Sequence, residues 1–198
     1  MLEIRKSSFA KSYENIFFRE FAKNLSKLFN DLKIDGLLIG SPVCEIDERL
    51  QIDALLITQN VVCIIDFKNY EGKIILPDEK NFELGLWRSF NGEHIKGGSY
   101  INPYIQLKNQ KAKFENIFNN FIKSNLSSGD RLNPKHIVLI LCFQKEVVID
   151  KEIPKSKELS FFIVDKKNYI EKIRDIIDVK DKDVNISKNS YSIFLKIF

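Results

Sequence analysis

Two aspartates and a lysine interrupt a pair of apolar, β-branched runs near the middle of the chain. Asp53 lies in the run 51–58, and Asp66 and Lys68 lie in the run 61–68. Only a Gln-Asn pair separates the two runs, and asparagine tolerates the positive φ that a tight turn needs. The pattern therefore predicts a β-hairpin that carries charged side chains on otherwise apolar strands.

The register of this hairpin decides whether the charged residues meet. If Thr58 pairs with Val61 across the turn, Asp53 lies directly opposite Asp66, and their Cβ atoms are about 5 Å apart on one face. A four-residue turn preserves this register, whereas a one-residue bulge would break it. Lys68 follows Asp66 by two positions, so it points to the same face of the sheet.

Two neighbouring carboxylates on an apolar strand pair repel each other and are penalised by burial. Lys68 can offset one negative charge, and a bound divalent cation can offset the other. Carboxylate oxygens suit Mg²⁺ or Mn²⁺, while His94 and His136 have no partner at a metal-binding spacing that would favour zinc. The alternative is a structural Asp–Lys ion pair beside a solvated second aspartate. The spacing of the residues alone leaves both interpretations open.

Composition limits the class of protein. The 198 residues are 44% hydrophobic, with 31 basic and 27 acidic side chains and a formal charge of +4. Such a chain can bury the core of one soluble domain, and it is not disordered, collagenous or stapled by disulfides. The slight positive charge permits an anionic partner without requiring one.

Targeting signals are absent from the pattern. The segment Met1–Ala10 is interrupted by charges and lacks an apolar core, so it does not resemble a signal peptide. No apolar run approaches the ~18 residues of a membrane span. Cys44, Cys63 and Cys142 form an odd, widely spaced set, which favours free thiols. We therefore expect a cytoplasmic protein that does not interact with a membrane.

Hydrophobic periodicity predicts the elements around the hairpin. An amphipathic helix is expected over Ser7–Lys33, and a second helix begins at Pro103 with Asn102 as its N-cap and runs to about Lys123. Beyond the hairpin, strands are expected at Leu37–Cys44, Gly72–Ile75, Leu86–Phe90, His136–Phe143 and Leu159–Val164. The C-terminal part is expected to contain a helix from Asp165 to about Ile177, a solvated linker over Asp178–Asp183 and a helix over Ser187–Phe198. This order predicts an α/β (α+β) fold with a mixed sheet, in which His136–Phe143 is a central strand.

A series of short motifs follows the same chain order. They are Glu14 on the first helix, Gln-Ile-Asp ending at Asp53, Asp-x-Lys-Asn-x-x-Gly over 66–72, Trp87, and Asn-Pro-x-x-Gln ending at Gln106. This series resembles the nuclease-related domain (NERD) family of the PD-(D/E)xK nuclease superfamily. The resemblance extends from Tyr13 to Phe143, although Asp66 stands where that family more often has glutamate.

The resemblance implies a fold, a reaction and a set of residue roles. The fold would be a restriction-endonuclease-like core in residues 1–150, with 151–198 as an extension packed on the core or leading to a further domain. The activity would be Mg²⁺- or Mn²⁺-dependent hydrolysis of DNA. Asp53, Asp66 and Glu14 would hold the metal, the last directly or through water. Lys68 would polarise the attacking water, and Gln106 would contact water or phosphate.

Several residues have two interpretations. Tyr70 and Trp87 could stack on nucleic-acid bases or pack in the core, and Lys108 and Lys111 could follow a phosphate backbone or simply be solvated. The alternative function is a catalytically silent nucleic-acid-binding or regulatory module of a larger helicase- or kinase-type protein. The apolar helix 187–198 needs a partner surface, which could belong to this domain, a second copy or a further domain.

Overall fold

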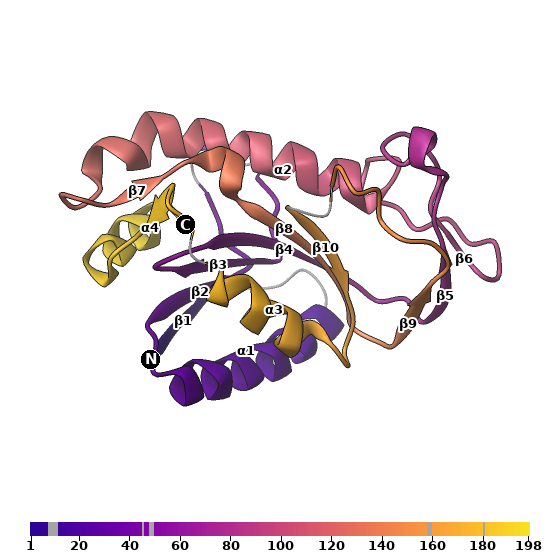
Figure 1. Cartoon of the computed structure of the whole chain (residues 1–198), viewed down its shortest axis with the longest axis horizontal. Helices are drawn as coiled ribbons and strands as arrows, with labels where there is room; N and C mark the ends of the chain where they lie inside the picture. The colour runs from indigo at the N-terminus through magenta and orange to yellow at the C-terminus, as the bar shows by residue number, and fades with distance from the viewer. Residues whose placement is uncertain (8–11, 45, 48–49, 158–159, 180) are drawn as a thin grey trace.

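A six-stranded mixed sheet forms the centre of the molecule, with the strand order β1-β2-β3-β4-β8-β10. The computed structural model describes residues 1–7, 12–44, 46–47, 50–157, 160–179 and 181–198. The strands are β1 (Leu2–Lys6), β2 (Gly36–Gly40), β3 (Ala54–Thr58), β4 (Val62–Lys68), β8 (Val138–Phe143) and β10 (Phe161–Val164). Helix α2 (Pro103–Ile117) covers one face of the sheet, and α1 (Ser12–Leu32) and α3 (Tyr169–Asp178) cover the other (Figure 1). The predicted α/β fold with a helix-flanked mixed sheet is thereby confirmed.

The sheet combines parallel and antiparallel strand pairs. β2, β3 and β4 are successive antiparallel neighbours, whereas β8 lies between β4 and β10 and is parallel to both. All six residues of β8 are buried, which confirms the prediction of a central strand. The edge strand β1 was not predicted, because its pairing with β2 joins segments on opposite sides of α1. Such long-range pairing leaves little signal in the local sequence.

Each strand sends alternate side chains into two separate apolar cores. In β4, Ile64 packs on the α2 side and Ile65 on the α1 side. On the α1 side, the ring of Phe21 stacks on Tyr169 at 5.0 Å between centroids, which joins α1 to α3. Because both faces of the central strands are apolar, a charged side chain can reach water only near a strand end.

The helices agree with the predicted periodicity more closely than with the predicted ends. The predicted start of the first helix includes Phe9, which lies outside the described residues, as does Leu159 at the predicted start of β10. Helix α2 begins at Pro103 as expected but becomes a π-helical turn at Phe118–Ile122 and a 3₁₀ turn at Lys123–Asn125. Among the described helices, none combines enough length and apolar character to cross a bilayer.

Two small sheets extend the central one. β5 (Gly72–Ile75) and β6 (Arg88–Ser89) fall within two predicted strands and pair antiparallel. β5 also pairs parallel with β9 (Val147–Ile149), a strand that was not predicted. β7 (Arg131–Leu132) pairs antiparallel with β11 (Val184–Asn185). The second pairing holds the end of the predicted linker 178–183 close to the residues that lead into β8.

The C-terminal helix finds its apolar partner surface within this chain. A 3₁₀ turn at Lys188–Ser190 leads into α4 (Tyr191–Ile197). Phe194 is fully buried in the core on the α2 side, and the ring of Phe198 stacks on Phe114 at 5.5 Å between centroids. Of the three partner surfaces left open by the sequence, the one in this domain is therefore used.

Candidate active site

The β3–β4 hairpin has the register that places the two aspartates side by side. Ile57 pairs with Val62 and Ala54 with Ile65, and the Thr58 N–H donates to the carbonyl of Val61 at 2.9 Å. Asp53 immediately precedes β3, one position beyond the last of these pairs. Its carboxylate Oδ2 accepts a hydrogen bond from the backbone N–H of Phe67 at 2.6 Å. The predicted hairpin is thus confirmed, and Asp53 is anchored next to Asp66.

Asp66, Lys68 and Gln106 form a closed triangle of polar contacts. The Lys68 Nζ lies 2.7 Å from Asp66 Oδ2 and donates to Gln106 Oε1 at 3.0 Å. The Gln106 Nε2 in turn donates to Asp66 Oδ1 at 2.9 Å. Asp66 is only 4% exposed, so each of its carboxylate oxygens depends on these two neighbours for compensation. The side chain of Gln106 therefore points toward the aspartates, as expected from the sequence.

Asn102 sets the start of α2 and thereby the position of Gln106. Its side-chain oxygen caps the helix by accepting from the Ile105 N–H at 2.9 Å, and Pro103 occupies the first turn. The fully buried Asn102 amide also donates to the carbonyls of Glu83 and Gly85 at 2.8 and 2.9 Å. One side chain consequently fixes both the helix start and the loop beside it.

A second glutamine on α2 holds the segment that enters β3. The buried Gln110 accepts a hydrogen bond through Oε1 from the backbone N–H of Gln51 at 2.8 Å, two residues before Asp53. Sequence reasoning missed this residue. Its spacing of four from Gln106, which places both on one helix face, is the signal that could have found it.

Burial and charge act strongly on Asp53. Burial, followed by the negative charge of Asp66, raises its pKa to about 8, against the opposing effects of the Phe67 N–H and Lys68. At neutral pH the folded protein therefore favours the protonated form of this carboxyl group. A divalent cation at the pair would displace that proton and offset the charge of both carboxylates.

One open cleft of about 490 Å³ is lined by Asp53, Asp66, Lys68 and Gln106. Glu14, from the first turn of α1, lines the same cleft, so it shares the site with the hairpin aspartates. Tyr70 lines the cleft as well. Glu93 and Lys96, from the loop before α2, also line it, although sequence reasoning did not single them out.

Three of the predicted nucleic-acid contacts are placed elsewhere. Trp87 is fully buried against Phe82 at 5.3 Å between ring centroids, so the suggestion that it stacks on bases is wrong. The Lys108 Nζ pairs with Glu83 at 2.9 Å on the exposed surface. Lys111 donates to the carbonyls of residues 135 and 137 at 2.7 and 3.0 Å, which points its amine away from the cleft.

His136 has two carboxylate neighbours that its spacing in the sequence did not indicate, whereas His94 has none in the described group. Among the described residues, His136, Asp181 and Asp183 are the three side chains whose potential ligand atoms all lie within 4.8 Å of one another. Their spacing in the sequence hid this group, because the pairing of β7 with β11 brings the aspartates to the histidine. His94 instead contacts the carbonyl of Ile101 through Nε2 at 2.6 Å.

Comparison with known proteins supports the resemblance seen in the motifs. Neither the curated proteins nor the solved structures contain a match to this chain. The model of the nuclease-related domain family does match, over residues 11–143, and this range includes Glu14, the hairpin aspartates, Lys68 and Gln106. Because the match covers more than half of the chain, this protein belongs to the nuclease-related domain (NERD) family.

Proposed function

We propose that this domain is a Mg²⁺- or Mn²⁺-dependent nuclease that hydrolyses phosphodiester bonds in DNA. The observation that carries the proposal is the convergence of Asp53, Asp66, Lys68 and Gln106 in a single cleft, which Glu14 also lines. A purely structural Asp–Lys pair would need neither the partly buried carboxyl group of Asp53 nor a glutamine that contacts both members.

The donor atoms fit a hard divalent cation. Asp66 offers carboxylate oxygens from β4, and Asp53 offers them from the residue before β3. The raised pKa of Asp53 reflects a cost of charging this carboxyl group that a cation would offset. Glu14 would complete the set from α1, directly or through water. When bound, such an ion supplies a Lewis acid that activates water and stabilises the charge that develops on the phosphate.

The remaining polar groups have roles that follow from their contacts. Lys68 places a fixed positive charge beside Asp66, where it can polarise an attacking water and stabilise negative charge on the phosphate. The Gln106 amide uses one N–H for Asp66 and retains a second hydrogen for a phosphate oxygen. Gln106 also lies near the N-terminal end of α2, where the positive end of the helix dipole favours an anion.

The test is cleavage of plasmid and single-stranded DNA in the presence of Mg²⁺, Mn²⁺ or EDTA. We expect cleavage that requires the metal and falls by at least about a hundredfold in Lys68→Met and Asp66→Asn, because each removes a charge that acts on the reacting phosphate. Lys166→Met is the matched control, since Lys166 pairs with Glu20 at 3.4 Å in an exposed ion pair outside the cleft.

Two results would contradict the proposal. Cleavage by Lys68→Met and Asp66→Asn at the rate of the parent protein would remove these residues from the mechanism. DNA binding without cleavage under any metal condition would favour the alternative, a catalytically silent binding or regulatory module of a larger protein. The comparison of plasmid with single-stranded DNA also identifies the preferred substrate.

A further inference from the structure

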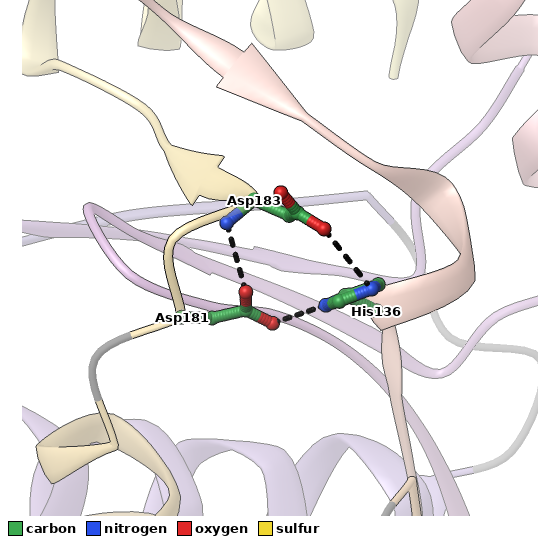
Figure 2. A group of neighbouring side chains, drawn as sticks. All are labelled: His136, Asp181 and Asp183. Atoms are coloured by element: carbon green, nitrogen blue, oxygen red, sulfur yellow. Dashed lines mark hydrogen bonds and ion pairs between the residues drawn. The ribbon is translucent and has the colours of Figure 1, made fainter.

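His136 contacts two aspartates, one through each nitrogen of its ring (Figure 2). His136 ends a short 3₁₀ turn before β8, and Asp181 and Asp183 precede β11. The His136 Nδ1 hydrogen-bonds to Asp181 Oδ2, and the Nε2 lies 3.4 Å from Asp183 Oδ2. One potential ligand atom from each side chain lies within 4.8 Å of the other two.

A neutral His136 ring has too few protons to donate a hydrogen bond to both aspartates. A neutral imidazole has one N–H and one lone pair, so only one of its two carboxylate contacts can be a hydrogen bond. With the N–H on Nδ1 toward Asp181, the Nε2 lone pair faces the carboxylate of Asp183. This lone pair and this carboxylate repel each other unless a positive charge lies between them.

The distance from His136 Nε2 to Asp183 Oδ2 is close to the separation of two ligand atoms that bind the same metal ion. At 3.4 Å, the distance from Nε2 to Asp183 Oδ2 exceeds that of an ordinary N–H···O hydrogen bond. Two ligands bound tetrahedrally at 2.0–2.1 Å from a zinc ion are separated by about 3.3 Å. A hydrogen bond from the other ring nitrogen to a carboxylate is also the usual way in which a protein orients a metal-binding histidine.

The backbone on both sides of the group is held independently of any ion. Lys111 donates to the carbonyls of Lys135 and Ile137, the residues that flank His136. On the other side, the Asn133 N–H donates to the carbonyl of Asp183 at 3.0 Å, next to the β7–β11 pairing. The segments that carry His136 and Asp183 are therefore held next to each other by backbone contacts.

The group is separate from the proposed nuclease site. In the parallel β4–β8 pair, Asp66 is the partner of Leu141, which is five residues beyond His136. At about 3.3 Å per residue along a strand, the two sites are about 16 Å apart. His136 and Asp181 instead border a different cleft, of about 480 Å³, through which water and ions can reach them.

We propose that the His136 Nε2 and the Asp183 carboxylate bind a divalent transition-metal ion, of which Zn²⁺ is the best match, and that Asp181 orients the imidazole through Nδ1. An imidazole nitrogen beside a carboxylate suits zinc better than Mg²⁺ or Ca²⁺, which take oxygen ligands. Solvent completes the coordination from the open cleft. The ion would connect the segment before β11, and with it the C-terminal helix, to the start of the central strand β8.

The test uses the full chain and zinc itself as the probe. After equilibrium dialysis against ZnCl₂, we expect the protein to retain about one equivalent of zinc at this site and to melt at a higher temperature than in EDTA. His136→Asn and Asp183→Asn should each weaken zinc binding by about tenfold or more. Their melting in EDTA should stay close to that of the parent, because both side chains are partly exposed.

Two further variants locate the ion. Asp53→Asn combined with Asp66→Asn removes carboxylates from the other cleft, and this protein should still bind zinc. The chain has 2 histidines, so His94→Gln leaves His136 as the sole source of imidazole ¹⁵N signals. In that variant, we expect zinc to shift the Nε2 resonance of His136.

Some results would overturn the proposal. If His136→Asn and Asp183→Asn bind zinc as tightly as the parent, the ion lies elsewhere. If the parent retains no zinc, or if the His136 ring shows two protonated nitrogens that zinc does not affect, the group is a charged ion-pair cluster without a metal. These outcomes do not depend on nuclease activity, so they leave the proposed function untouched.

Discussion

Replacement of Asp53 by asparagine tests the electrostatics of the candidate active site directly. In the folded protein, burial and the neighbouring Asp66 raise the pKa of Asp53 to about 8 from its ordinary value of 3.8. Between these two pH values the folded chain retains a proton that the unfolded chain has released. The free energy of unfolding of the metal-free protein must therefore fall as the pH rises through this range.

The size of the effect follows from the same two pKa values. At pH 7 the unfolded carboxyl group is about three pH units above its pKa, and at 1.36 kcal/mol per unit the upper limit is about 4 kcal/mol. Asp53 lines an open cleft and is only partly buried, so water screens part of this penalty. We expect Asp53→Asn to recover about 1–2 kcal/mol at pH 7, because its amide oxygen can still accept the Phe67 N–H while the ionisable group is gone.

The assay is urea unfolding in EDTA at pH 5, 6, 7 and 8 for the parent and the variant. The parent should lose stability progressively over this range, while Asp53→Asn should depend much less on pH and should be the more stable protein at pH 8. Asp31→Asn, at an exposed position on α1, is the matched control and should follow the parent. If the two aspartate variants show the same pH dependence, or if Asp53→Asn is less stable than the parent at pH 8, the reasoning about the buried carboxyl pair is refuted.

Three further predictions use other contacts of the site. Mg²⁺ or Mn²⁺ should raise the melting temperature of the parent and raise that of Asp53→Asn much less, because the ion binds the folded carboxylate pair. Equal shifts of the two proteins in thermal melts would contradict this. Gln110→Leu leaves the Gln51 N–H without its acceptor. Urea unfolding should therefore show a free energy of unfolding lower by about 1–3 kcal/mol, and DNA cleavage should slow. Unchanged stability would exclude the positioning role. Trp87→Phe should reduce the free energy of unfolding without changing the Kd for DNA in a binding titration, because Trp87 is fully buried. Weaker DNA binding by a stably folded variant would contradict this and indicate that Trp87 stacks on bases.

Local physical rules were sufficient to predict much of the site from the sequence. The Gln-Asn turn and the alternation of the flanking strands set the β3–β4 register, and this register determines that Asp53 meets Asp66. The N-cap at Asn102 set the start of α2, and therefore the helical turn on which Gln106 lies. These features depend on interactions between residues close in the sequence, where turn geometry and side-chain period leave a clear pattern.

Tertiary packing decided what those local rules could not. The sequence surroundings of Trp87 and Lys111 did not show that the first fills the core and that the second binds carbonyls leading into β8. His136 appeared isolated because its aspartate neighbours are 45 and 47 positions away, and only the pairing of β7 with β11 brings them together. Such contacts depend on how whole elements pack, and each residue's own neighbours in the chain carry little information about them. The sequence alone thus determined that the hairpin brings Asp53 next to Asp66, and the tertiary structure decided which side chains from distant elements lie around them.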